Sequence, residues 1–329
     1  MEDGITIVLD SGELLSGICG ANDGNLKVME GSLGGHIAAR GNEIHFKGVD
    51  EAGVRRFKTM IDNLIAAVRE GEMPSPEYVE ALAETLILDG DEQAAFREDA
   101  PQAAAGPFRE AMIQIPHGFH RVYPRSRNQA AYIRGMRSHD ISFCVGPAGT
   151  GKTYLAIAEA LRLVLSKKAR KLVLTRPVVE AGESLGFLPG DLTQKINPYL
   201  RPLYDAMEAL IPFEVIHRME ETRVIEIAPL AYMRGRSLND CVVILDEAQN
   251  TTREQMKMFL TRIGQGARAV ITGDATQLDL PRRTDSGLLH AVEILKAVEG
   301  IYFAFLHTTD VVRNPLIKKI IQAYDDQEI

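Results

Sequence analysis

Short apolar runs alternate with longer helical segments throughout the C-terminal part of this chain. Six runs have the length and apolar character of buried strands, at residues 141–145, 171–175, 224–228, 242–246, 269–272 and 302–305. The segments between them favour helices, and residues 154–165 contain neither Gly nor Pro. Strands that alternate with helices are typical of a parallel sheet covered by helices. We therefore predict a three-layer α/β domain over residues 119–329.

The N-terminal part has a different order of elements. It predicts a strand, two helices, a pair of strands and two further helices, at residues 5–9, 11–18, 25–33, 36–40, 43–47, 50–70 and 76–88. Within the helix at 50–70, Val54, Phe57, Ile61 and Leu64 recur at the spacing that places them on one face. This pattern predicts a small α+β domain over residues 1–88.

Residues 89–118 form the clearest linker in the chain. They are polar and acidic, with Gly and Pro at several positions, and short helical turns are predicted only at 93–96 and 108–112. We expect a connection between two domains, part of which packs on the second one.

A phosphate-binding loop follows the first apolar run of the second domain. The pattern G-x-x-x-x-G-K-[ST] is matched by Gly146, Pro147, Ala148, Gly149, Thr150, Gly151, Lys152 and Thr153, between a predicted strand and a predicted helix. Such a loop turns its N–H groups toward an anion, and the helix N-terminus adds partial positive charge. We expect Lys152 to reach the β- and γ-phosphates and Thr153 to coordinate Mg²⁺. The alternative is a glycine-rich turn with a surface lysine.

Two acidic residues end the apolar run at 242–246. Asp246 would hold Mg²⁺ beside Thr153, because ligands of parallel sheets bind where the strands end. Glu247 would then act on the water that attacks the γ-phosphate, as general base or orienting group. This pair favours hydrolysis over transfer to a second substrate. The alternative is an acidic turn after a core strand.

The next apolar run ends in a polar loop that contains Gln277. We expect Gln277 to contact both the γ-phosphate and the loop at Asp246 and Glu247. The segments 246–249 and 273–278 resemble motifs II and III of the superfamily 1 helicases. A closer resemblance is to the PhoH-like family of bacterial ATPases, and it is carried by residues 128–129, 146–153, 175–177, 180–186, 231–236, 246–250, 273–278 and 310–313.

This resemblance implies a RecA-like P-loop NTPase core with a parallel sheet, which binds ATP and Mg²⁺. It places Gln129 at the adenine edge, supported by Asn128 or Tyr132, because an amide both donates and accepts hydrogen bonds. The alternative for Gln129 is a residue at the helix N-terminus without contact to a base. The resemblance places Arg176 and the loop at 183–191 on an RNA path. For an arginine finger it favours Arg313, with Arg236 second and Arg234 a further candidate. The alternative for each arginine is a surface salt bridge.

The N-terminal order of elements resembles a KH-type RNA-binding module. Such a module grips RNA through a G-x-x-G loop between its first two helices, where this chain has Gly17 and Gly20. Ile18 and Cys19 depart from the basic or polar residues expected there. Two interpretations stay open, namely RNA contact through this loop and a KH-like fold that serves assembly.

Composition is that of a soluble enzyme. The chain has 329 residues, of which 45% are hydrophobic, and it contains no apolar run long enough to span a membrane. A formal net charge of −8 disfavours indiscriminate nucleic-acid binding but permits a local basic channel. Cys19, Cys144 and Cys241 are isolated and lack zinc-site spacing, so we expect buried thiols in a reducing compartment. The N-terminus lacks the features of a signal peptide. We expect a cytoplasmic protein.

The chain ends sixteen residues after Arg313, without the second RecA-like domain that closes the ATP site of a helicase. This predicts a homo-oligomer, favouring a hexameric ring with ATP between subunits. The function that we expect is Mg²⁺-dependent ATP hydrolysis coupled to RNA binding or remodelling. The family resemblance also permits a regulatory ATPase that partners a YbeY-type endoribonuclease and unwinds nothing. A small-molecule phosphotransferase is a third hypothesis, disfavoured by Glu247.

Overall fold

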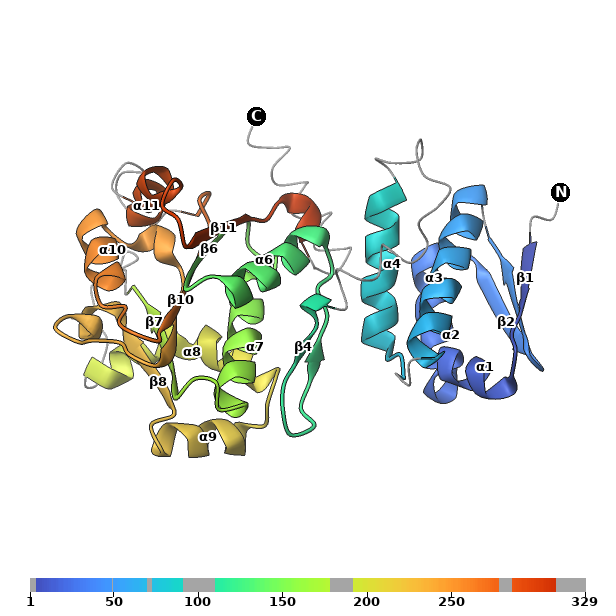
Figure 1. Cartoon of the computed structure of the whole chain (residues 1–329), viewed down its shortest axis with the longest axis horizontal. Coiled ribbons are helices and arrows are strands. Elements are labelled where there is room, and N and C mark those ends of the chain that lie inside the picture. Colours follow the sequence, from blue (N-terminus) through green and yellow to red (C-terminus); the bar gives the residue numbers. More distant parts are fainter. Residues whose placement is uncertain are drawn as a thin grey trace. The chain divides into compact units, whose positions relative to one another are not determined.

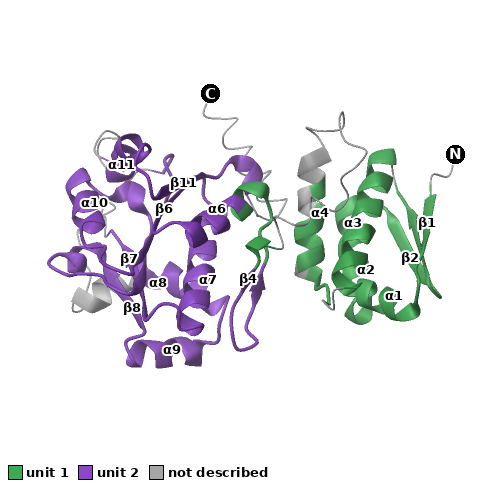
Figure 2. Ribbon diagram, viewed as in Figure 1, with its two compact units in different colours: residues 1–112, 123–130 green, residues 113–122, 131–329 purple. Residues whose placement is uncertain are grey.

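The computed structural model describes residues 4–48, 50–69, 73–90, 110–177, 192–277 and 286–311. Contacts divide the chain into two compact units (Figure 2). The first consists of residues 1–112 and 123–130, and the second of residues 113–122 and 131–329. Most of the segment expected to be a linker, residues 91–109, lies outside the described residues.

The first unit is a three-stranded antiparallel sheet with helices on one face (Figure 1). Its elements are β1 (Gly4–Val8), α1 (Gly12–Cys19), η1 (Ala21–Asp23), α2 (Gly24–Leu33), β2 (His36–Arg40), β3 (Glu43–Lys47), α3 (Glu51–Arg69) and α4 (Pro76–Gly90). The sheet has the order β1-β3-β2. The predicted order of a strand, two helices, two strands and a helix is therefore confirmed, and α4 packs on α2 and α3.

The core of the first unit forms between α3 and the sheet. Phe57 of α3 stacks on Phe46 of β3 with ring centroids 4.5 Å apart. Ile61 and Leu64, two further residues of the predicted apolar face, are fully buried. Burying each such side chain contributes about 1.5–3 kcal/mol, so the amphipathic pattern of α3 accounts for much of this core.

The G-x-x-G segment of the first unit is the end of helix α1 and not a separate loop. Gly17, Ile18 and Cys19 form the last turn of α1, where the Ile18 side chain is fully buried and Cys19 is 5% exposed. A Cβ on Gly17 would lie 2.9 Å from Cγ1 of Val68 in α3. Gly20 ends the helix at a φ of 69°, a left-handed conformation that glycine adopts without strain. These glycines serve packing and helix termination, because the residues between them belong to the core.

The second unit contains a six-stranded parallel sheet with the order β11-β6-β10-β9-β7-β8. Its elements are β4 (Ile113–Gln114), β5 (Arg121–Val122), α6 (Arg127–Ser138), β6 (Ile141–Val145), α7 (Lys152–Leu165), β7 (Lys171–Arg176), α8 (Leu192–Glu208), α9 (Phe213–Glu221), β8 (Ile225–Pro229), η2 (Leu230–Met233), β9 (Cys241–Leu245), η3 (Ala248–Asn250), α10 (Arg253–Leu260), β10 (Arg268–Gly273), α11 (Gly287–Leu295), β11 (Ile301–Phe305) and η5 (Thr308–Asp310). The first turn of α6 belongs to the first unit. All six predicted strands are present, in the RecA-like P-loop fold.

Helices cover both faces of this sheet (Figure 1). Met256 and Phe259 of α10 share one apolar cluster with Phe143, Val243 and Ile271 of the strands. On the other side, α7 packs on β7, β9 and β10, and α8 packs on α7 and β7. Because successive side chains of a strand point to opposite faces, these near-continuous apolar strands have both faces buried.

A short hairpin of β4 and β5 joins the second unit ahead of the sheet. Ile113 and Ile115 are fully buried, and β4 packs on α7. The end of the expected linker therefore contributes to the second unit, as expected for part of that segment.

The three cysteines are buried and unpaired, as predicted. Burial raises the pKa of the Cys144 thiol, and it raises that of Cys241 to about 11, so both stay protonated near neutral pH. Among the helices of the described ranges, none is long and apolar enough to cross a membrane.

Candidate nucleotide-binding site

The phosphate loop connects β6 to α7 at the carboxyl edge of the sheet. Gly149 and Gly151 have φ angles of 80° and 79°, which strain residues that carry a Cβ. The N–H of Gly146 donates to the carbonyl of Gly273 at 3.1 Å, and so fastens the loop to the end of β10. A Cβ on Gly146 would lie 2.6 Å from the Leu306 carbonyl oxygen. The glycines of the motif are therefore required by backbone conformation and by close packing.

Lys152 begins α7 and lies over the loop. Its Nζ donates to the carbonyls of Gly146 at 2.6 Å and Pro147 at 2.7 Å, and the residue is only 9% exposed. Burial lowers the pKa of Lys152, while the nearby charge of Asp274 acts in the opposite direction. A triphosphate would offer this ammonium group a stronger acceptor than two neutral carbonyls.

The two predicted metal ligands are brought together by the fold. Thr153 Oγ1 donates to Asp246 Oδ1 at 2.6 Å, across a separation of 93 residues in sequence. Thr272 Oγ1 donates to the same oxygen at 2.7 Å, and the N–H of Asp246 donates to the Thr175 carbonyl at 2.9 Å. Asp246 is 5% exposed. Its position is therefore fixed from both neighbouring strands, β7 and β10.

These oxygen ligands fit Mg²⁺. In proteins Mg²⁺ is bound by one or two carboxylates together with substrate phosphates and water. In the described part of the chain no group of three His, Cys, Asp or Glu side chains could hold a metal by itself. A hydroxyl and a carboxylate beside a phosphate loop thus suit a metal that enters with a nucleotide.

Glu247 follows Asp246 with a φ of 52°, a left-handed conformation that is uncommon for a residue other than glycine. Both of its carboxylate oxygens have partners. Oε1 lies 3.0 Å from Nη2 of Arg176, and Oε2 accepts a hydrogen bond from Nε2 of Gln249. The proposed base is thus held within a charged and hydrogen-bonded cluster.

Gln249 and Asp274 are residues of the site that the sequence did not single out. The Gln249 side chain is buried and joins the loop after β9 to the loop after β10, since its Oε1 accepts from the N–H of Asp274 at 2.9 Å. Asp274 Oδ1 accepts from the N–H and hydroxyl of Thr276 at 2.9 and 2.6 Å. Its Oδ2 is buried, with no hydrogen-bond partner among the described residues. Both lie inside the segments 246–249 and 273–278 that resemble helicase motifs II and III, so the indication was present although neither residue was given a role.

A cavity of about 310 Å³ lies beside the loop. It is lined by Ala148, Gly149, Gly151, Lys152, Thr153, Tyr154, Arg176, Pro202, Ala206, Asp246, Glu247, Gly273, Asp274 and Gln277. Eight of the predicted site residues, from three separate segments, therefore share one cavity: Ala148, Gly149, Gly151, Lys152, Thr153, Asp246, Glu247 and Gln277. Gln277 is exposed, and its N–H donates to the Asp274 carbonyl at 3.3 Å.

Arg236 is not brought to this cavity. Its guanidinium binds both oxygens of Glu226, at 2.5 and 3.0 Å, and Lys171 donates to one of them. These hydrogen bonds lower the pKa of Glu226 to about 2, with that from Arg236 the largest cause. Glu226 and Lys171 lie where β8 and β7 begin, at the edge opposite the phosphate loop. Arg236 therefore stabilises the amino edge of the sheet in its own subunit.

The remaining predicted residues are placed as follows. Gln129 is 3% exposed in the first turn of α6, where its Oε1 accepts from the N–H of Arg125 at 2.6 Å. Asn128 beside it is half-buried, and adenine recognition by the two stays a prediction.

Arg234 is exposed at the end of η2. Arg313, and the loop at 183–191 expected to line an RNA path, lie outside the described residues. Arg176, expected on that path, lines the nucleotide cavity.

Comparison with known proteins identifies relatives over nearly the whole chain. A sequence model of the family described as PhoH-like protein matches residues 121–325. A PhoH-like protein of Mycobacterium leprae is 45% identical over 96% of this chain and 87% of its own length. A PhoH-like protein of Bacillus subtilis is 45% identical over 94% of this chain and 93% of its own.

Two further matches are narrower. Protein PhoH of Escherichia coli K12 is 42% identical over 62% of this chain and 58% of its own. Among solved structures, the Pif1 helicase of Candida albicans matches 59% of this chain and 42% of its own, with 17% identity and a TM-score of 0.32. The family model, together with the two relatives that match over most of their length, shows that the chain belongs to the PhoH-like protein family.

Proposed function

We propose that this protein hydrolyses ATP with Mg²⁺ and couples the reaction to binding or remodelling of RNA. The observation that carries the ATPase part is the hydrogen bond between Thr153 and Asp246 in the cavity that also contains Lys152 and Glu247. A phosphate loop, a metal-binding hydroxyl and carboxylate, and a second carboxylate beside them are the parts that phosphoryl transfer to water requires.

In the proposed reaction, the oxygen of a water molecule attacks the γ-phosphorus. The bond from this phosphorus to the oxygen that bridges the β- and γ-phosphates breaks, and ADP and inorganic phosphate are formed. Glu247 accepts the proton that the water loses. Lys152 and the N–H groups of the loop offset negative charge on the phosphates. Mg²⁺, held by Thr153 and Asp246, would neutralise charge on the β- and γ-phosphate oxygens.

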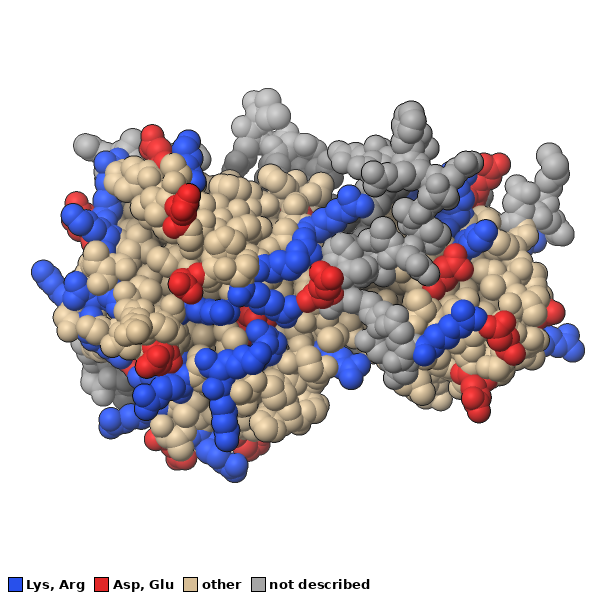
Figure 3. Space-filling model, viewed as in Figure 1, with Lys and Arg blue, Asp and Glu red and all other residues tan. Residues whose placement is uncertain are grey.

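The RNA part of the proposal is supported by basic side chains that gather on the face of the second unit shown in Figure 3. We use the term basic face for the solvent-accessible basic residues of α6, of α7 and of the turn after α7, namely Arg134, Arg137, Arg162, Lys167 and Lys168. It stands out on a chain whose net charge is −8. RNA affinity depends largely on neutralising backbone phosphates, so a local surplus of positive charge favours such a ligand.

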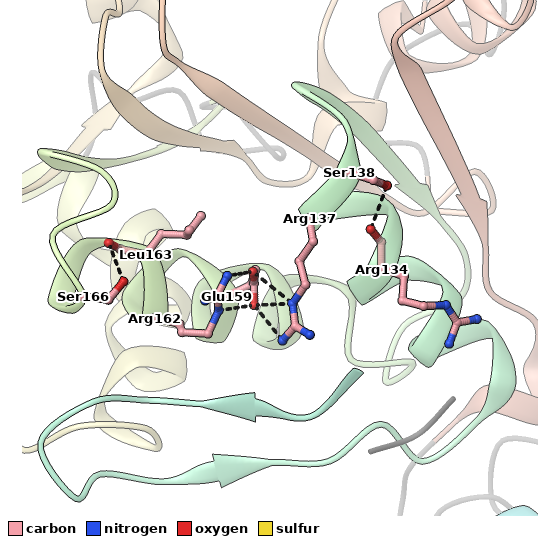
Figure 4. A network of polar contacts seen from close by, with 7 residues as sticks. All are labelled: Arg134, Arg137, Ser138, Glu159, Arg162, Leu163 and Ser166. Carbon is pink, nitrogen blue, oxygen red and sulfur yellow. Dashed lines mark hydrogen bonds and ion pairs between the residues drawn. The ribbon is translucent and has the colours of Figure 1, made fainter. Parts of the chain in front are cut away.

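Two arginines of this face share one buried carboxylate (Figure 4). The Glu159 side chain is 3% exposed, and it lies 3.3 Å from Nη2 of Arg137 and 2.5 Å from Nη2 of Arg162. One buried carboxylate therefore holds two guanidinium groups in place. Arg137 and Arg162 are 26% and 20% exposed, so parts of these ordered groups reach solvent.

We extend the proposal to a homo-oligomer, with a hexameric ring as the favoured form. Among the described residues Arg176 is the arginine that lines the cavity. A second arginine at the γ-phosphate would come from Arg313, or from Arg236 of a neighbouring subunit, which would have to leave Glu226. A YbeY-type endoribonuclease stays the alternative partner if RNA itself does not stimulate turnover.

Steady-state ATP hydrolysis with and without single-stranded RNA tests the proposal. We expect Mg²⁺-dependent turnover that RNA increases. Lys152→Ala should abolish nucleotide binding, whereas Glu247→Gln should retain it and stop turnover, because only the base is lost. A wild-type protein without ATPase activity in either condition would contradict the enzymatic part.

The basic face is tested by the salt dependence of RNA binding. Replacing both Lys167 and Lys168 with Ala should weaken binding to all sequences alike and reduce the salt slope by about 1 for each RNA phosphate that these lysines neutralise. The matched control replaces Lys257 and Lys296, two exposed lysines on or beside the helices of the opposite layer. Equal effects of the two pairs would exclude the basic face as the RNA site. Strand displacement would then separate a remodelling enzyme from an ATP-dependent regulatory partner.

A further inference from the structure

Arg176 occupies a position between the nucleotide cavity and α8. It is the last residue of β7, its side chain is 20% exposed, and it lines the cavity together with Lys152 and Glu247. Its Nη2 lies 3.0 Å from Oε1 of Glu247, and its Nη1 donates to the carbonyl of Tyr199 in α8 at 3.1 Å. One guanidinium group therefore contacts both the proposed base and α8, a helix that packs on the sheet.

In this arrangement both carboxylate oxygens of Glu247 are held by other side chains, and neither is directed to an attacking water. Its Oε1 is paired with the positive charge of Arg176, and its Oε2 accepts from Gln249. Both oxygens that could receive a proton from water are engaged. Turnover would therefore need Glu247 to be released from at least one of these partners.

A γ-phosphate in the cavity would compete with Glu247 for Arg176. It carries more negative charge than one carboxylate, and its oxygens match the planar fork of a guanidinium group. Arg176 lines the same cavity as Lys152, so the competing ligand would enter on the side that the guanidinium already faces. ADP lacks the γ-phosphate and would leave the pair with Glu247 intact.

We propose that Arg176 is a nucleotide-responsive arginine with two positions, one on Glu247 and one on the γ-phosphate of ATP. Its transfer to the phosphate frees Glu247 to act on water and adds a positive charge at the transferring group. This inference rests on the proposed ATPase function and adds a way in which the bound nucleotide controls the proposed base. The arginine acts within its own subunit, and therefore differs from a finger supplied by Arg313 or Arg236.

The contact with Tyr199 extends the consequence to α8. Pro202 and Ala206 of this helix also line the cavity, and α8 packs on α7 and β7. Movement of Arg176 toward the phosphate would change or break its bond to the Tyr199 carbonyl, so α8 would report which nucleotide is bound. Hydrogen exchange in α8 should then differ between ATP-analogue and ADP complexes.

The test compares the affinity for ADP with that for a non-hydrolysable ATP analogue, using the full chain with Mg²⁺. For Arg176→Ala we expect ADP affinity within about twofold of wild type, analogue affinity about tenfold weaker, and kcat lower by about 10² or more. The control is Arg170→Ala, an exposed arginine immediately before the same strand. It should change none of the three quantities.

A double-mutant cycle separates the two-position arginine from a fixed ion pair. Glu247→Gln removes the charge that holds Arg176, so it should tighten binding of the ATP analogue by about fivefold and leave ADP binding unchanged. In the Arg176→Ala background this tightening should disappear. Equal tightening in both backgrounds, or equal losses for ADP and the analogue in Arg176→Ala, would overturn the inference.

Arg176→Lys keeps the experiment informative if Arg176→Ala fails to fold, as judged by its thermal unfolding. Lysine retains the charge but lacks the fork, so the same changes are expected with smaller size. Analogue affinity and kcat equal to wild type in the lysine variant would also contradict the proposal. The affinities for ADP and for the ATP analogue can be measured without turnover. A wild-type protein without ATPase activity would refute the proposed function, but the contribution of Arg176 to distinguishing the two nucleotides could still be measured.

Discussion

The side chain of Gln249 accepts a hydrogen bond from the backbone N–H of Asp274 at 2.9 Å and donates another to Glu247. This one buried amide therefore connects the loop after β9 with the loop after β10. β9 and β10 are neighbouring strands, so Gln249 fastens two adjacent loops to each other. Gln249 thus makes a contact with the acidic loop of the kind expected of Gln277, whose own role stays a prediction.

Replacing Gln249 with Ala should therefore affect turnover more than nucleotide affinity. The substitution leaves the buried N–H of Asp274 without this partner, which costs about 1–3 kcal/mol, and removes one of the two side chains that hold Glu247. We expect kcat to fall about tenfold or more while the affinity for ADP changes less than about threefold. The control is Gln265→Ala, at an exposed glutamine. Equal kcat in both variants would show that the bridge is not needed.

Asp246 should determine how much Mg²⁺ the reaction requires. Asp246→Asn keeps the shape of the side chain but removes the negative charge that attracts the metal. We expect the Mg²⁺ concentration for half-maximal hydrolysis to rise about tenfold or more. Asp240→Asn, at an exposed aspartate before β9, serves as the control. An unchanged Mg²⁺ requirement in Asp246→Asn would argue against this carboxylate as a metal ligand.

Gly17→Ala and Gly12→Ala should have different effects on the free energy of unfolding. A Cβ at Gly17 would lie 2.9 Å from Val68, whereas one at Gly12 would meet no atom within 4 Å. Gly17→Ala should lower the free energy of unfolding by about 1–3 kcal/mol through overpacking. Gly12→Ala should be neutral or stabilising by up to about 1 kcal/mol, because alanine favours helix. Urea unfolding of both variants measures this difference. Loss of RNA affinity without loss of stability in Gly17→Ala would restore the G-x-x-G interpretation.

The ion pair of Glu226 with Arg236 and Lys171 should make stability depend on pH in the acid range. The pKa of Glu226 is lowered from 4.5 to about 2, so its contribution is fully present above pH 4.5 and is lost as the pH falls through 2. Allowing for partial exposure, we expect Glu226→Gln to reduce stability by about 1–3 kcal/mol at pH 7.

The difference between wild type and Glu226→Gln should shrink between pH 4.5 and pH 2, as followed by urea unfolding. Glu299→Gln, at an exposed glutamate, should show no such trend. A difference that is constant over this range would mean that the charge of Glu226 does not stabilise the fold.

The parts of the site that the sequence predicted depend on neighbours in the chain. The phosphate loop is a local motif whose glycines, lysine and threonine act within a few residues of one another. The acids at Asp246 and Glu247 end an apolar run, and the carboxyl ends of parallel strands share one edge. The contact of Thr153 with Asp246 therefore followed from strand prediction and a general rule about sheets. The buried cysteines and the apolar face of α3 were predictable for the same local reasons.

The G-x-x-G segment shows where a local pattern misleads. Glycines at positions 17 and 20 are compatible with an exposed turn and with close packing in a helix. Only the position of α3 decides between them, because Val68 lies where a side chain at position 17 would be. The burial of Ile18 favours the packed helix. The relevant neighbour is about fifty residues away in sequence, beyond the reach of periodicity.

By itself the sequence determined the six strands, the phosphate loop and the acids that identify a nucleotide site, because each is defined by residue type and short spacing. Tertiary structure decided which polar side chains meet. It brought Arg176 to Glu247, Gln249 to Asp274, and Arg236 to Glu226 at the opposite edge. The physical reason is that strand order, with β9 between β7 and β10, sets which loops are adjacent. An arginine is compatible with any carboxylate within reach, and only the fold determines which one that is.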